Sequence, residues 1–135
     1  MKKRLGPFVT ALMFLSLVVF PATAVLGADL QVEDAAVCSN VVDRQPVDSA
    51  ASFPASVGRL YFFTRITGAQ EPTQVIHTWY YGDAERARVT LSVNGSNWRT
   101  YSSKVIQANE IGSWHVEVLD ADGNSLETVQ FDVTE

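Results

Sequence analysis

The sequence contains very little cysteine and histidine, and each shortage removes a class of function. Its 135 residues include one Cys and two His. A single cysteine, Cys38, excludes an intramolecular disulfide even in an oxidising compartment. His77 and His115 stand at no local spacing with Cys38 that suits a transition metal, so we expect no metal site and no cofactor. No cation flanks Cys38 to lower its pKa, so we expect a buried small apolar residue in the first strand rather than a reactive thiol.

Long apolar runs are also scarce. The one uncharged apolar stretch, Phe8 to Phe20, is shorter than the roughly 20 residues that span a bilayer, which argues against a retained membrane anchor. It follows Lys2-Lys3-Arg4 and precedes small residues that end at Ala24, an order typical of a cleavable secretory signal. We therefore expect cleavage after Ala24, or as late as residue 28. The protein should then be periplasmic or secreted, with no membrane segment.

Positive charge is in short supply beyond the N-terminus. The chain has 10 basic and 15 acidic residues, and without Lys2, Lys3 and Arg4 the balance is 7 against 15, a net charge of −8. Nucleic-acid phosphate and anionic membrane surfaces would repel such a protein, so we expect neither as a partner. The remaining length of about 110 residues suits one domain, residues 29–135.

Short β-rich segments dominate what is present. From Glu33 onward, runs rich in Val, Thr and aromatic residues alternate with Gly, Asn, Asp and Pro, and no apolar helical periodicity persists. This pattern predicts an all-β, antiparallel, immunoglobulin-like or fibronectin-type β-sandwich of about seven strands. The expected strands are approximately 35–42, 58–67, 74–81, 84–93, 97–106, 113–119 and 126–133. Residues 44–57, which hold Pro46 and Pro54, should form a long surface crossing rather than a hairpin.

Two dipeptides predict tight hairpins. Gly82-Asp83 and Asn94-Gly95 both favour the turns that join antiparallel strands through two residues. The resulting three-stranded sheet would place Arg88 over Tyr101 and Lys104 opposite Glu85. Its exposed face would carry a basic and aromatic patch of His77, Trp79, Arg86, Arg88, Arg99, Tyr101 and Ser103. One extra residue near Gly82 would shift the register of the hairpin by one position. The side chains of His77 and Trp79 would then face the core instead of solvent.

Other aromatic residues fit the core. Trp98 and Trp114 alternate with apolar or small residues that should face inward, and a buried Trp is common in such sandwiches. His115 and Glu117 should then lie on the solvated face opposite Trp114.

Three motifs resemble one bacterial family. They are His77-Thr-Trp-Tyr-Tyr81, Trp98-Arg-Thr-Tyr-Ser-Ser-Lys104 and Gly112-Ser-Trp-His-Val116 with Asp122-Gly123. In this order they are similar to the family called domain of unknown function 2914, from about Val41 to Val133. The resemblance implies membership but assigns no role to any residue.

The sequence favours a non-catalytic binding or accessory module. Aromatic rings stack on sugars and guanidinium groups bind carboxylate or phosphate, so an envelope glycan, an anionic small molecule or a protein partner would suit the patch. One alternative is a cell-envelope hydrolase that uses Ser102 or Ser103 with Lys104. Another is a structural subunit that assembles through an exposed aromatic face.

Overall fold

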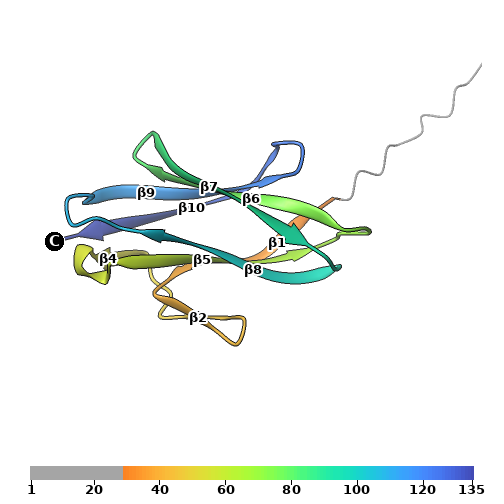
Figure 1. Ribbon diagram of the computed structural model, residues 1–135, viewed down its shortest axis with the longest axis horizontal. Coiled ribbons are helices and arrows are strands. Elements are labelled where there is room, and N and C mark those ends of the chain that lie inside the picture. The colour runs from red at the N-terminus through yellow and green to blue at the C-terminus, as the bar shows by residue number, and fades with distance from the viewer. Residues whose placement is uncertain (1–28) are drawn as a thin grey trace, which may run out of the picture.

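The structure, a computed structural model, describes residues 29–135 as two β-sheets packed face to face, with a third, two-stranded sheet beside them (Figure 1). The expected secretory signal lies outside the described residues. Within residues 29–135, no helix has the length and apolar character needed to cross a membrane.

Residues 29–135 form ten strands and one short 3-10 helix. Six of the seven expected strands are present with small differences at their ends, whereas the expected strand 35–42 is divided between β1, which begins at residue 31, and β2. Strands β2 to β4 and the helix η1 occupy the segment before β5. The bounds are β1 (Gln31–Cys38), β2 (Asn40–Val42), β3 (Gln45–Val47), β4 (Ser52–Pro54), η1 (Ala55–Val57), β5 (Arg59–Thr67), β6 (Thr73–Tyr81), β7 (Ala84–Val93), β8 (Asn97–Val105), β9 (Gly112–Asp120) and β10 (Ser125–Thr134).

The strand order identifies the type of sandwich. One sheet has the order β1-β5-β8, and the other has the order β4-β10-β9-β6-β7. The pairs are antiparallel, except that β4 runs parallel to β10. The seven long strands thus divide between the two sheets in the Greek-key arrangement of a fibronectin-type domain, which confirms the predicted fold class.

Alternating side chains of both sheets form the core between the layers. Along β5, Leu60, Phe62 and Ile66 are fully buried, as the period of two residues in a strand requires. Trp114 is 1% exposed and stacks against Phe131, with ring centroids 5.9 Å apart. The core position predicted for Trp114 is confirmed, and Trp98 packs against the same core while remaining partly exposed.

The hairpin expected at Asn94-Gly95 is wrong. β7 and β8 are edge strands of different sheets, so residues 94–96 carry the chain from one layer to the other. A tight hairpin of this kind would need positive φ at the glycine, and Gly95 does not have it. A Cβ on Gly95 would lie 3.4 Å from the Trp98 ring, so the glycine gives room to that ring. Lys104 consequently lies opposite Leu60 instead of Glu85.

The two-residue loop at Gly82-Asp83 is confirmed, but the register beyond it differs from the prediction. Tyr81 pairs with Ala84 across the loop, and then Arg86 forms a β-bulge without a partner on β6. Such a bulge reverses which face each later residue occupies. The exposure predicted for His77 and Trp79 is therefore wrong, and both side chains are fully buried in the core.

A hairpin of β2 and β3 covers part of the outer face of the three-stranded sheet, where a plain crossing was expected. It projects from that layer in Figure 1. Beneath it, outward-facing Phe63 is only 3% exposed, and Cys38 at the end of β1 is 0% exposed. Burial raises the pKa of the Cys38 thiol, in agreement with the inert role expected from the sequence.

Candidate functional site

Three of the predicted site residues lie on the outer face of the three-stranded sheet. Arg99, Tyr101 and Ser103 alternate along β8 and point away from the core, whereas Ser102 between them is buried. Alternation within a single strand is local, so their common face was correctly predicted although the neighbouring strand was not. Their neighbour is β5, where Arg65, Phe63 and Tyr61 stand opposite them in turn.

Two adjoining hollows form a groove on this outer face, which we call the β8 groove. The first has a volume of about 300 Å³, is lined on the outer face by Arg44, Phe63, Arg99 and Tyr101, and extends over the edge of β8 to Trp98, Thr100 and Ser92 of β7. The second, of about 310 Å³, shares Phe63 and Arg99 and continues to Asp34, Gln45 and Pro46. The groove thus lies between the β2–β3 hairpin and β8, with Phe63 as its floor.

The charges in the β8 groove are unbalanced. Arg65 and Arg99 stand directly opposite each other on neighbouring strands, an arrangement of like charges that destabilises a sheet. Arg65 is neutralised by Asp34, whose carboxylate accepts a bond of 2.6 Å from its guanidinium and helps to raise the pKa of Arg65. Among residues 29–135, no carboxylate lies within 4.0 Å of the guanidinium of Arg99 or Arg44. An anion placed here would relieve the repulsion.

Arg44 reaches the groove from a strained turn. Val42 pairs with Gln45, so Asp43-Arg44 forms a two-residue hairpin with φ of 52° and 59°. Aspartate enters this left-handed region readily, but arginine carries a cost of about 1–3 kcal/mol there. Glycine would fit the turn better, so folding alone does not explain the side chain at position 44.

Exposed aromatic surface accompanies the cations. Tyr101 is 48% exposed, and its ring lies 6.1 Å from the ring of Tyr61 at an angle of 57°. Val42, at the end of β2 beside the turn, is 49% exposed. An exposed ring and guanidinium groups therefore occur together at the β8 groove.

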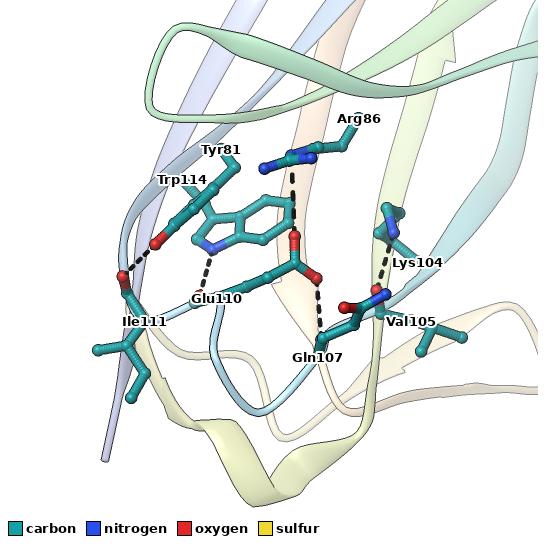
Figure 2. Close-up of polar contacts among 8 residues, drawn as sticks. All are labelled: Tyr81, Arg86, Lys104, Val105, Gln107, Glu110, Ile111 and Trp114. Carbon is teal, nitrogen blue, oxygen red and sulfur yellow. Dashed lines mark hydrogen bonds and ion pairs between the residues drawn. The ribbon is translucent and has the colours of Figure 1, made fainter.

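Arg86 and Arg88 belong to the other sheet and do not join the β8 groove. Arg88 bonds to Glu85 at 3.0 Å, and Arg86 lies over the Tyr81 ring, 5.4 Å from its centroid. Figure 2 shows the Arg86 guanidinium directed toward the Glu110 carboxylate, 3.8 Å away. The predicted contact of Arg88 with Tyr101 is wrong because their strands lie in different sheets.

The same corner ties down the loop between β8 and β9. Trp114 donates its indole N–H to the Glu110 carbonyl at 2.9 Å, and Tyr81 donates its hydroxyl to Ile111 at 2.6 Å (Figure 2). The Glu110 side chain accepts the Gln107 backbone N–H at 3.0 Å. These contacts explain the buried Glu110 and the third family motif as parts of the fold.

His77 lies in a hydrogen-bonded network inside the core. Its Nδ1 is 2.7 Å from Ser102 Oγ, its Nε2 is 3.1 Å from Thr64 Oγ1, and Trp79 donates its indole N–H to Ser102 Oγ at 3.1 Å. A neutral ring protonated on Nε2 satisfies every group, because Ser102 then accepts from Trp79 and donates to Nδ1. Burial lowers the pKa of His77 to about 3.

The hydrolase hypothesis requires the hydroxyl of Ser102 or Ser103 beside the amine of Lys104, and the structure separates these groups. Ser102 is 5% exposed and faces the core network, and Ser103 accepts a bond of 2.8 Å from Arg59 on the outer face. Lys104 donates to the Val105 carbonyl at 2.9 Å (Figure 2). Among residues 29–135, no hydrogen bond joins Lys104 to either serine.

A larger hollow of about 580 Å³ lies elsewhere, beside the Gly82-Asp83 turn. Its polar lining includes Asp83, Ser113, His115 and Asp132. The His115 ring stacks on Tyr80 with centroids 4.6 Å apart, and Ser113 donates to Asp132 at 3.3 Å. The lining contains no cation of the predicted patch, so size alone does not make this hollow the better candidate.

Sequence analysis missed Arg44, Phe63 and Asp34 as members of the groove. They come from three separate elements before residue 70, whereas the prediction considered one stretch from 77 to 103. The available signal was the dipeptide Asp43-Arg44 between two short apolar segments. Because it lacks the Gly or Asn typical of such turns, it did not indicate a hairpin.

The fold and the groove define a fibronectin-type β-sandwich domain with a basic, aromatic groove on its smaller sheet. Residues 72–133 match the family described as "Protein of unknown function (DUF2914)", which confirms the predicted family over that segment. The match begins at residue 72 instead of near Val41, so it covers β6 to β9 and most of β10. A search of curated proteins found no match.

Three motif residues of this matched segment, His77, Trp79 and Ser102, form the buried network. Trp114 is likewise fixed in the core by the loop contact to Glu110. Arg99 differs from them, because its guanidinium is on the surface and has no carboxylate neighbour among residues 29–135. The motifs thus mainly describe the fold, whereas Arg99 and the exposed Tyr101 of the second motif are not needed for the core.

Proposed function

We propose that this protein is an exported, non-catalytic binding module whose ligand occupies the β8 groove. The ligand would be an envelope glycan, another anionic molecule or a protein partner, held by Arg44, Arg99 and Tyr101. Of the seven residues first considered, Arg99, Tyr101 and Ser103 remain on the binding face. His77, Trp79, Arg86 and Arg88 are assigned other roles.

The observation that carries the proposal is the pairing of Arg99 with Arg65. A cation opposite another cation lowers the stability of the sheet, and no carboxylate of residues 29–135 compensates Arg99. The strained backbone of Arg44 adds a second cost at the same groove. Two features of the β8 groove, the Arg65–Arg99 pair and the backbone of Arg44, thus lower the stability of the fold. Their occurrence at the same groove supports a binding role for it.

Binding explains the chemistry better than hydrolysis does. A serine nucleophile needs a substrate beside it, and the core covers Ser102 together with the histidine that it contacts. Ser103 is on the surface, but its neighbour is the Arg59 guanidinium and not a base. We therefore assign these residues to the fold and to the groove rim.

The experiment is a binding screen of acidic and neutral bacterial glycans against the wild type, Arg99→Gln and Arg88→Gln. Arg88 is the matched control, because it is an exposed arginine on the other sheet. We expect glycan binding that Arg99→Gln weakens and Arg88→Gln leaves unchanged. Equal binding by all three proteins would contradict the β8 groove as the site, and the absence of binding by all three would rule out a glycan as the ligand.

Self-association is measured on the same samples by sedimentation. The assembly hypothesis requires a dimer that Tyr101→Ala dissociates, whereas a glycan-binding module stays monomeric in both forms. Export is checked by N-terminal sequencing of the protein recovered outside the cytoplasm. The expected start is Val25, or a residue no later than Asp29.

A further inference from the structure

We infer that the ligand of the β8 groove is an oligosaccharide in which a sugar that carries a carboxylate adjoins an uncharged sugar. The inference rests on the proposed function, since it names the ligand class of the same groove. It follows from the different linings of the two hollows.

The first hollow suits a carboxylate. Arg44 and Arg99 line it from two separate elements, and neither guanidinium has a carboxylate within 4.0 Å among residues 29–135. The planar guanidinium fork matches the two oxygens of a carboxylate, and such charge-assisted bonds are about twice as strong as neutral ones. A carboxylate between them would satisfy donors that the fold leaves free.

The aromatic lining favours a sugar acid over a small inorganic anion. Tyr101 borders the same hollow with 48% of its surface exposed, and Phe63 forms the floor. A ring presents an apolar face on which the C–H face of a sugar can stack, whereas a bare ion gains nothing from it. The volume of about 300 Å³ is at the lower end for small-molecule sites, which suits one sugar unit.

The second hollow suits an uncharged neighbour. It shares Phe63 and Arg99 with the first, so a chain that passes over Arg99 enters both. Its other polar groups are Asp34 and Gln45, and the Asp34 carboxylate is already paired with Arg65. Oxygen acceptors and an amide suit sugar hydroxyl groups, and a second negative charge beside Asp34 would be repelled.

The test compares acidic oligosaccharides with their own methyl esters by isothermal titration calorimetry. The panel is trigalacturonate, a mannuronate trimer, a hyaluronan tetrasaccharide and the N-acetylglucosamine–N-acetylmuramate disaccharide, each as acid and as ester. Inorganic phosphate and glucose 6-phosphate form the phosphate arm. The proteins are the wild type, Arg99→Gln, Arg99→Lys, Tyr101→Phe, Tyr101→Ala and the control Arg88→Gln.

We expect at least one acid to bind about tenfold or more tightly than its ester, as loss of a charge-assisted bond implies. Arg99→Gln should abolish that preference, and Arg99→Lys should restore only part of it because lysine lacks the fork. Tyr101→Phe should retain binding, whereas Tyr101→Ala should weaken acid and ester alike. The two acids that contain an uncharged neighbour, the hyaluronan tetrasaccharide and the muramate disaccharide, should bind better than the uniformly charged trimers.

The outcomes separate this inference from the proposed function. If esters or neutral glycans bind as well as acids and Arg99→Gln still weakens their binding, the groove is a binding site. The inference that the ligand is recognised through a carboxylate is then wrong. Equal or tighter binding of the phosphate compounds also overturns the inference. If Arg88→Gln has the same effect as Arg99→Gln, both proposals fail. If no compound binds, the inference fails and a glycan is excluded as the ligand of the proposed function.

Discussion

Acidification should destabilise this protein through one buried side chain, His77. The ring is fully buried between Phe62, Ser102 and Thr64, and burial alone lowers its pKa from 6.5 to about 3. The folded protein therefore keeps His77 neutral across a range in which the unfolded chain is protonated. Because the unfolded state binds the extra proton, stability is complete above about pH 6.5 and is lost as the pH falls toward 3.

The magnitude follows from that pKa interval. Stability changes by about 1.4 kcal/mol per pH unit where only the unfolded state is protonated. Between about pH 7 and about pH 4.5 the expected loss from His77 is on the order of 2.5 kcal/mol. This is a large part of the about 5–15 kcal/mol that stabilises a typical domain.

Urea unfolding of the wild type and His77→Gln across this pH range measures the effect. Glutamine keeps hydrogen-bonding groups in the core but does not titrate here, so the contributions of the surface carboxylates are the same in both proteins. The wild type should lose about 2.5 kcal/mol more than the variant on acidification. Parallel curves for the two proteins would refute the buried neutral histidine.

Three other substitutions test the packing. Ser102→Ala leaves the Trp79 indole N–H and His77 Nδ1 without a partner, so the free energy of unfolding should fall by about 1–3 kcal/mol per stranded group in denaturant titrations. Gly68→Ala should destabilise far more than Gly58→Ala, because both glycines have positive φ but only at Gly68 would the added Cβ clash with a backbone oxygen, that of Asp29; equal melting temperatures would contradict this. Thr78→Val should raise the free energy of unfolding by about 1 kcal/mol, because the buried Thr78 Oγ1 has no hydrogen-bond partner within residues 29–135; a loss of stability in urea would show that the hydroxyl is satisfied.

The strands could be predicted from the sequence because their signals are local. Alternating β-rich runs ended by Gly, Asn or Asp located β5 to β10 with small differences at their ends. The same local rule placed Arg99, Tyr101 and Ser103 on one face of β8. Alternate residues of one strand point to the same face of the sheet, and this holds whichever strand lies beside it.

The pairing between strands could not be predicted, because it depends on a β-bulge and on a crossing between the sheets, and no residue pattern in the sequence distinguishes either of them. The bulge at Arg86 resembles any other position of a polar edge strand, yet it decides that His77 and Trp79 are buried. Asn94-Gly95 is as compatible with a crossing between sheets as with a hairpin. The contribution of Arg44 to the groove required the three-dimensional placement of a segment more than 50 residues before Arg99.

The measurement that tests the central claim most directly is chemical-shift mapping of the backbone amides during titration with the acidic oligosaccharide panel. The account predicts saturable shifts at Arg44, at Phe63 and from Arg99 to Tyr101, with Tyr80 and His115 on the other sheet unchanged. Shifts centred on Tyr80 and His115, or none at saturating concentrations, would contradict the assignment of the β8 groove as the binding site.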